Sequence, residues 1–232
     1  MSARTVVLLL AVAASSAAAC DRPSGGSKAS PPEAGPAPTK AAHVRVIAPG
    51  DAPADLASSH VSLSVIKDRD LTAPVTARLS LVDGAVALAS ATPSAHLTLD
   101  LDSFDSGIPI RNERVRNLFF ETSSRGWDTA EISIPSIPSD VVTALRSARH
   151  VENAHLEGHL RVHGHTAGVA LVVDASYADD GRLSVKTSSP AEVKISDLGL
   201  RDNQRRLSAV CMHDSIDDVV KVEAVLEFSP PR

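Results

Sequence analysis

The sequence predicts an all-β domain, built either as a sandwich or as a closed antiparallel barrel. Apolar and polar residues alternate with a period of two in many short runs, which is the pattern of half-buried strands. Glycine, proline, aspartate and serine separate these runs, as expected for antiparallel strands joined by turns. The alternation does not distinguish the two architectures. A barrel of about eight strands would have an interior that side chains fill or that holds one small ligand.

Residues 1–19 predict a lipoprotein signal peptide. A basic residue, Arg4, precedes a short apolar run that is too short to span a membrane and that ends in small residues. Three alanines, beginning at Ala17 where leucine is preferred, then lead into Cys20, and this resembles a bacterial lipobox. The resemblance implies a lipid on the sulfur of Cys20 and a protein anchored to a membrane of the bacterial cell envelope. The alternative is an ordinary secretory signal, cleaved elsewhere, in which Cys20 has no such role.

Residues 20–42 are expected to form a disordered linker, because they are rich in proline, glycine, alanine and serine. Residues 43–232 suit one domain with a sizeable core. The formal net charge of −5 and the absence of basic runs argue against a nucleic acid partner. The sequence leaves homo-oligomerisation open. Only two cysteines occur, and with Cys20 used for the lipid, Cys211 is expected as a buried free thiol.

The predicted strands follow one another along residues 60–228. Two of the runs show the alternation best: residues 60–65, with Val61, Leu63 and Val65 on one face, and residues 96–104. The other runs are residues 78–82, 84–88, 130–135, 156–162, 168–177, 182–186, 191–196 and 221–228. Residues 178–182, Ala-Asp-Asp-Gly-Arg, are a clear hairpin turn signal, and residues 163–166 are a weaker one.

Two segments have helical rather than strand spacing. Residues 138–150 contain Ser139 as a candidate N-cap, an acidic first turn and basic residues near the end. In residues 107–121, Val115, Leu118 and Phe119 form an apolar stripe with i, i+3, i+4 spacing. Such a short amphipathic helix would lie across the mouth or wall of a barrel, where the adjacent Phe119 and Phe120 supply much apolar area.

Three segments, in this order along the chain, resemble the YceI-like family. Residues 103–120 carry a Ser-x-x-Ser-Gly sequence, Arg111 and the paired phenylalanines of one family signature, with Asn112 where the family has aspartate. Residues 156–173 resemble a second signature through Gly158, His163, Gly164 and Thr166 among others. Residues 194–200, Lys-Ile-Ser-Asp-Leu-Gly-Leu, resemble a third.

The resemblance implies an extended, eight-stranded antiparallel, lipocalin-like barrel with one or two short helices, located in the periplasm. It also implies a long apolar tunnel, which in some members holds a polyisoprenoid or quinone-like lipid. We expect no cofactor. The lining expected to bind such a ligand here is Val61, Leu63, Val65, Leu97, Leu99, Leu101, Phe119, Phe120, Leu160, Val162, Leu171, Val173, Val222 and Leu226. Arg111 and Arg114 are candidate contacts for a polar head group. The alternative is that these arginines pair with barrel carboxylates such as Asp102 or Asp105.

Four histidines, His155, His159, His163 and His165, suggest a metal site. On one strand, however, residues four apart lie roughly 13 Å apart, which is too far to share one zinc ion. Only His163 and His165 could converge across a turn, and two ligands make a poor site. We therefore expect no metal and interpret these histidines as solvent-facing.

No sequence motif indicates catalysis, so the protein is not expected to be an enzyme. Glycine-flanked serine elbows, paired metal-binding histidines on a helix and phosphate-binding glycine loops are all absent. A Cys211–His213 pair would need both side chains on one face, which i, i+2 spacing on a strand permits.

The expected function is therefore that of a membrane-tethered periplasmic lipoprotein that binds or carries a long apolar ligand in a barrel cavity. One alternative is a filled barrel that acts as a structural or interaction module of the cell envelope. The second alternative is an enzyme that uses Cys211 and His213. A cavity in the structure would distinguish the first alternative from the carrier.

Overall fold

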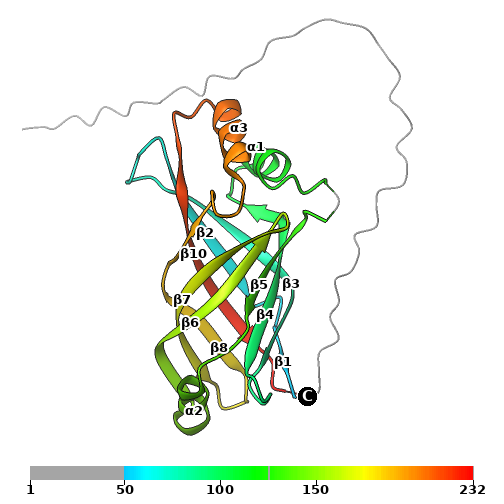
Figure 1. Ribbon diagram of the computed structural model, residues 1–232, viewed down its shortest axis with the longest axis vertical. Coiled ribbons are helices and arrows are strands. Elements are labelled where there is room, and N and C mark those ends of the chain that lie inside the picture. The colour runs from blue at the N-terminus through cyan, green and yellow to red at the C-terminus, as the bar shows by residue number, and fades with distance from the viewer. Residues whose placement is uncertain (1–49, 125, 232) are drawn as a thin grey trace, which may run out of the picture. The chain divides into compact units, whose positions relative to one another are not determined.

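The β-strands pair into one antiparallel sheet that closes on itself (Figure 1). The structure, a computed structural model, describes residues 50–124 and 126–231; the predicted signal peptide, Cys20 and the linker lie outside this part. The barrel strands are β2 (His60–Lys67), β3 (Val75–Ala87), β4 (Ser94–Asp105), β5 (Thr129–Ile134), β6 (His150–Val162), β7 (His165–Tyr177), β8 (Leu183–Ser189) and β10 (Ile216–Phe228). Their order is β3-β2-β10-β8-β7-β6-β5-β4, and the pairing of β3 with β4 closes the ring. The predicted eight-stranded antiparallel barrel is confirmed.

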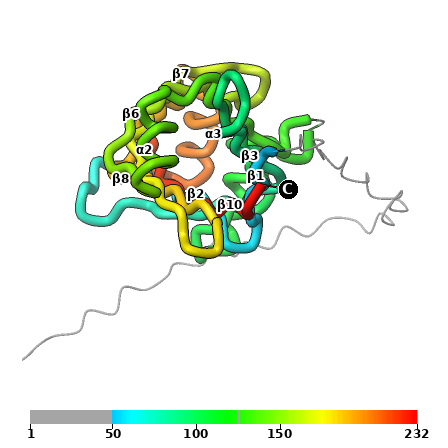
Figure 2. Tube along the Cα trace, turned by 90° about the horizontal axis from the view of Figure 1, so that it is seen from below, coloured from blue at the N-terminus to red at the C-terminus, as the bar shows by residue number. Residues whose placement is uncertain are grey.

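Two short strands and three helices complete the described part of the chain. Strand β1 (Ala52–Pro53) pairs with β3, and β9 (Ala191–Lys194) pairs with β10. Helix α1 (Pro109–Arg114), its π-helical continuation η1 (Val115–Phe119) and α3 (Arg201–Cys211) lie at one end of the barrel, which we call the upper end. Helix α2 (Ser139–Ala148) lies at the other, lower end, and Figure 2 shows it at the near opening of the ring of strands.

The alternation seen in the sequence becomes an inside and an outside of the barrel. In β4, Leu97, Leu99 and Leu101 are buried, whereas the residues between them are partly exposed. Residues 78–82 and 84–88, predicted as separate strands, belong largely to one strand, β3, because Gly84 does not interrupt it. A Cβ atom at Gly84 would lie 2.8 Å from Leu97 Cδ2, so glycine here permits close packing of β3 on β4.

The helices differ in two respects from the sequence prediction. Ser139 is the first residue of α2 rather than its N-cap; Pro138 occupies the cap position, and no side chain caps the helix. Helix α3 was not predicted, because Leu207 is its only buried residue and the residues before Leu207 are all polar. Cys211 is consequently the last residue of a helix, followed by Met212 in the left-handed conformation, and not part of a strand.

Two glycines of the β6–β7 hairpin allow a direct comparison. Gly158 in β6 faces β5 so closely that an added Cβ would lie 2.4 Å from Ile134 Cδ1 and 2.8 Å from the carbonyl oxygen of Ser133. A Cβ atom added at Gly168 in β7 would have no neighbouring atom within 4 Å.

We expect Gly158→Ala to destabilise the protein by about 1–3 kcal/mol, because the backbone carbonyl of Ser133 cannot move aside without disturbing the β5–β6 pairing. Gly168→Ala is the matched control and should change the free energy of unfolding by less than about 0.5 kcal/mol. Urea unfolding of both variants measures the difference. Equal stabilities of the two variants would show that this close approach is not a constraint.

Candidate functional site

The upper end of the barrel contains an apolar cavity of about 280 Å³ beneath the helices. Strands β2, β3, β4 and β10 form its walls, and α1, η1 and α3 lie over it. Its apolar lining is Leu63, Val65, Val75, Ala77, Phe104, Ile108, Ile110, Val115, Phe119, Phe120, Ile195, Leu207, Ile216 and Val220. Lys67, Arg111, Arg114, Cys211 and His213 are its polar members. Because Ile108 and Ile110 both line the cavity and are more than 40% exposed, the cavity opens to solvent beside α1.

The lower end contains a second, smaller cavity of about 110 Å³. Its lining is apolar except for Thr187 and includes Val141 and Leu145 of α2. These two side chains are buried, so α2 covers this end with its apolar face. The lower cavity therefore has no charged group with which to hold a polar ligand.

A band of leucines lies between the two cavities. Leu79, Leu99 and Leu101, which we call the central band, are buried and line neither cavity. Along β4, Leu99 and Leu101 stand between Leu97 of the lower cavity and Phe104 of the upper cavity. The two cavities share no lining residue, so the interior holds two cavities where the resemblance implied a single long tunnel. On β2 and β10 their linings follow one another directly, at Val61 and Leu63 and at Val222 and Val220.

The residues predicted as ligand-binding fall into three groups. Leu63, Val65, Phe119 and Phe120 line the upper cavity, together with Arg111 and Arg114. Val61, Leu97, Leu171, Val173, Val222 and Leu226 line the lower cavity. Leu99, Leu101, Leu160 and Val162 pack in the core and line neither cavity.

Several residues of the upper cavity were missed by the sequence analysis. Val75 and Ala77 precede the alternating run that was recognised in β3, and Leu207 belongs to the unpredicted helix α3. Lys67 and Ile216 lie at the ends of β2 and β10, where alternation is lost. Extending the two-residue period backwards from Leu79 would have found Ala77 and Val75.

The turn before α1 sets the position of the arginines. Gly107 has a φ of 73°, and its N–H donates to the carboxylate of Asp105, which also accepts from Asn112 Nδ2 at 2.8 Å. Hydrogen bonds from Gly107 and Asn112 lower the pKa of Asp105. Asn112 Oδ1 in turn accepts from the backbone and hydroxyl of Ser106. This network fixes the first turn of α1, from which Arg111 reaches the cavity mouth.

Arg111 and Arg114 do not pair with the carboxylates proposed for them. Within residues 50–124 and 126–231, neither guanidinium forms an ion pair, and Arg114 Nη1 instead donates to Cys211 Sγ at 3.7 Å. The third arginine of this segment, Arg116, donates from its Nη1 to the carbonyl of Asp102 at 3.0 Å. The described residues therefore do not show the alternative in which Arg111 and Arg114 pair with Asp102 or Asp105.

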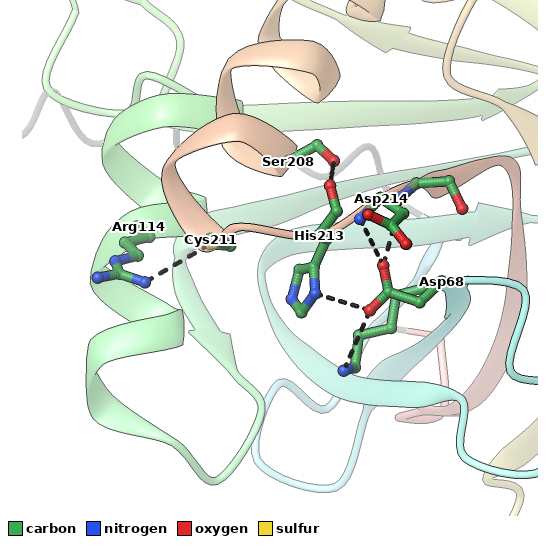
Figure 3. A network of polar contacts seen from close by, with 8 residues as sticks. Asp68, Arg114, Ser208, Cys211, His213 and Asp214 are labelled. Atoms are coloured by element: carbon green, nitrogen blue, oxygen red, sulfur yellow. Dashed lines mark hydrogen bonds and ion pairs between the residues drawn. The ribbon is translucent and has the colours of Figure 1, made fainter. Parts of the chain in front are cut away.

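Cys211 and His213 both line the upper cavity but do not form a hydrogen bond with each other. Figure 3 shows the His213 ring turned toward Asp68 and Cys211 facing Arg114. His213 Nδ1 lies 2.8 Å from Asp68 Oδ2, and Asp68 also accepts hydrogen bonds from the N–H groups of Asp214 and Ser215. Although desolvation opposes it, these backbone hydrogen bonds lower the pKa of Asp68. The arrangement holds the β2–β3 loop against the end of α3, and it lacks the contact between the Cys211 thiol and the His213 imidazole that a Cys–His nucleophile would use.

Phenylalanines attach η1 to the barrel. Phe119 and Phe120 contact each other edge to face with ring centroids 5.0 Å apart, and Phe120 contacts Phe104 of β4 in the same manner at 6.0 Å. Phe104 and Phe120 are buried, while Phe119 is half-buried at the cavity. Three of the four phenylalanines of the chain thus form one cluster that roofs the upper cavity.

His163 contacts the end of η1 from the turn between β6 and β7. It occupies the two-residue turn between β6 and β7, where it and Gly164 both have positive φ, and its Nε2 contacts the carbonyl oxygen of Phe120. Its ring stacks on Trp127 with centroids 4.3 Å apart. His163 is therefore half-buried and not solvent-facing as predicted, whereas His155, His159 and His165 are exposed. Burial is the main cause that lowers the pKa of His163, and the hydrogen bond to Phe120 opposes it.

Residues 50–124 and 126–231 contain neither a metal-binding cluster nor a helix that could span a membrane. No three histidine, cysteine, aspartate or glutamate side chains in this part lie close enough to hold a metal ion. None of its helices has the length and apolar character needed to cross a bilayer.

Comparisons with known proteins agree with this architecture. The YceI-like domain family matches residues 54–228. The fold is similar to a polyisoprenoid-binding domain from Saccharophagus degradans implicated in plant cell wall breakdown, with a TM-score of 0.64 and 22% identity over 79% of this chain and 100% of that one. It is also similar to BcnA from Burkholderia cenocepacia, with a TM-score of 0.51 and 19% identity over 75% of this chain and 98% of that one. At these identities the two likenesses establish the fold. No curated protein matches the chain.

The depressed pKa of His163 predicts a pH dependence of stability. Below its ordinary pKa of about 6.5, the unfolded chain takes up a proton that folded His163 resists, so stability should fall as the pH decreases from 7.5 to 5.5. His163→Gln should reduce this loss, whereas His159→Gln, a change at an exposed histidine of β6, should leave it unaltered. Urea unfolding at both pH values measures the loss. Identical pH dependence in the wild type and His163→Gln would contradict the assignment.

Proposed function

The chain belongs to the family of YceI-like domains, and from this premise we propose that it is a membrane-tethered periplasmic lipoprotein that binds or carries a long apolar lipid, such as a polyisoprenoid or a quinone-like molecule. The observation that carries the proposal is the upper cavity, which is apolar, open beside α1 and close to the lower end of the size range of ligand pockets, about 300–1,000 Å³. A filled structural barrel would have no such space.

Burial of the apolar tail would supply the affinity. Each buried CH₂ group contributes about 0.8 kcal/mol, so a tail of several isoprene units binds well without specific polar contacts. The tail would enter beside Ile108 and Ile110 and extend toward the central band. A tail longer than the upper cavity would reach the lower cavity only if Leu79, Leu99 and Leu101 change their packing.

The polyisoprenoid class is supported by the similar domain from Saccharophagus degradans, which is described as binding polyisoprenoids. The tether is supported by the lipobox-like sequence that ends at Cys20. The two supports fit together, because a long apolar lipid has a very low free concentration in water and a tethered protein stays near its source.

Cavity-filling substitution tests the binding site. Val220→Phe in β10 places a larger side chain in the upper cavity and displaces about two CH₂ groups of a bound tail, so the affinity for an apolar ligand should fall about tenfold. Val225→Phe, on the exposed face of the same strand, is the matched control and should bind as the wild type does. Native mass spectrometry of each protein, purified from its own membranes, would show whether a lipid is bound. Wild-type protein that is consistently free of lipid and does not bind a prenyl quinone would refute the proposal.

The proposed anchor is tested at Cys20. Cys20→Ser should move the protein from the membrane fraction to the soluble fraction and abolish incorporation of labelled fatty acid, because no thiol remains for the lipid. Cys211→Ser, which alters the other cysteine, should leave both properties unchanged. Continued membrane association of Cys20→Ser would argue against the lipoprotein assignment.

A further inference from the structure

The exposed apolar side chains of the described residues gather at the upper end of the barrel. Seven large apolar side chains are exposed in residues 50–124 and 126–231, and Met212 and Leu71 are the most exposed of them, at 82% and 75%. Leu56 and Val225 lie elsewhere. The other five belong to segments at the upper end, and we call them the apolar rim: Leu71, Ile108, Ile110, Val210 and Met212. Exposed apolar residues that occur singly are common, but a group of them at one end is typical of an interaction surface.

Three segments supply the apolar rim. The loop between β2 and β3 contributes one member, the end of α3 two and the start of α1 two (Figure 1). Figure 3 shows the contacts that join these segments: Asp68 of the loop pairs with His213 after α3, and Cys211 of α3 accepts a hydrogen bond from Arg114 of α1. The three parts of the rim are therefore held together and do not form separate loops.

The apolar rim borders the opening of the upper cavity. Ile108 and Ile110 are exposed and also line the cavity. Met212 stands between two residues that line it, and Leu71 lies in the loop that joins lining residues of β2 and β3. A ligand that enters or leaves the cavity thus passes a border of exposed apolar side chains.

The form of the rim favours a lipid bilayer over a protein as its partner. Its members are the tips of one loop and of two helix ends, and they lie around an opening. A bound peptide helix or strand needs a groove or a free sheet edge instead. A bilayer takes up separate apolar side chains at the boundary of its head groups and acyl chains, and this boundary does not have to match their shape.

The charges beside the rim fit the head groups of such a bilayer. Arg69 lies two residues before Leu71, and Arg111 follows Ile110 directly. Within the described part of the chain, neither arginine pairs with a carboxylate. Asp70, next to Leu71, accepts hydrogen bonds within its own loop. Because lipid phosphate groups attract exposed cations, the rim offers contacts to acyl chains and to head groups at the same time.

We propose that the apolar rim docks on a lipid bilayer, with Leu71, Val210 and Met212 inserted at the boundary of head groups and acyl chains and with the upper cavity open toward the membrane. The docking surface itself does not depend on the proposed function, whereas its use in taking up or releasing a lipid rests on that function. In the docked state an apolar tail passes between bilayer and cavity without crossing water, and so avoids the cost of exposing its surface.

Docking of this kind is weak and reversible. Only a few side chains insert, and even a single acyl chain gives marginal, reversible membrane binding. The proposed anchor at Cys20 keeps the rim at a high effective concentration near a bilayer, so weak docking is sufficient in the tethered protein. Without the anchor the contact is lost on dilution, in agreement with the expected soluble fractionation of Cys20→Ser.

A dye at a single position tests insertion directly. The Cys20→Ser chain is produced from residue 20 on, so that neither a signal peptide nor a lipid contributes, and Cys211→Ser removes the other thiol. Nitrobenzoxadiazole is attached at Leu71→Cys or, as the matched control, at Leu56→Cys, an exposed leucine between β1 and β2. Vesicles of equal parts phosphatidylcholine and phosphatidylglycerol should shift the emission of the dye at position 71 to shorter wavelength. The emission at position 56 should not change.

Substitution of rim residues measures their contribution. Leu71→Ser/Met212→Ser should bind the same vesicles about tenfold more weakly in a sedimentation assay, because two apolar side chains no longer insert. Leu56→Ser/Val225→Thr, at exposed apolar residues outside the rim, is the matched control and should bind as the parent chain does. Without vesicles, both variants should bind farnesol as the parent chain does, which shows that the fold and the cavity are intact.

The outcomes separate the docking surface from the proposed function. Vesicle binding that is absent in the parent chain, or equally strong in Leu71→Ser/Met212→Ser, would overturn the docking surface. An emission shift of the same size at position 56 would also overturn it. A dimer that dissociates in the rim variant would assign the rim to a second copy of the chain instead. Failure of the parent chain to bind farnesol would count against the proposed function and leave the docking result unchanged.

Discussion

Closure of the sheet is the constraint on which the rest of the structure depends. Because β3 pairs with both β2 and β4, no barrel strand has a free edge, and each strand must turn its alternate residues inward. The inward residues are largely valine, leucine and alanine, with few aromatic side chains in the chain to fill a wide interior. An interior of this composition leaves space at both ends, and it needs a cover wherever its apolar surface would meet water.

The helices that cover the two ends of the barrel are held in place by different kinds of contact. At the lower end α2 supplies the buried face of an ordinary amphipathic helix. At the upper end the cover is held by polar contacts to backbone carbonyls: His163 contacts the carbonyl of Phe120, and Asn203 Nδ2 donates to that of Phe119 at 2.8 Å. Gln204 Nε2 likewise donates to the carbonyl of Ile216. These contacts satisfy carbonyl groups at the end of η1 and join α3 to β10, so the cover is well fixed while the first turn of α1, with Ile108 and Ile110 exposed, borders the opening.

The sequence alone predicted those elements that produce a periodic pattern of apolar residues. The strands were recognisable because a half-buried strand must alternate, as Leu97, Leu99 and Leu101 do. Closure into a barrel was not recognisable from alternation and came from the resemblance of residues 103–120 and 156–173 to a known family. Helix α3 escaped detection because one buried leucine leaves no periodic signal. The division of the interior could not be foreseen either, because whether a leucine lines a cavity or fills the centre depends on its height in the barrel and not on its place in the alternation.

The central band also has a consequence for movement within the barrel. Leu79, Leu99 and Leu101 are buried and packed against their neighbours. Close-packed leucine side chains leave no lasting opening, although they change rotamers from time to time. On the β3 and β4 side of the barrel, a ligand tail would pass between the upper and lower cavities only when these side chains move. The time that a ligand tail stays in either cavity would then depend on temperature and on the size of these three side chains, and not on the affinity of the cavity mouth for the ligand.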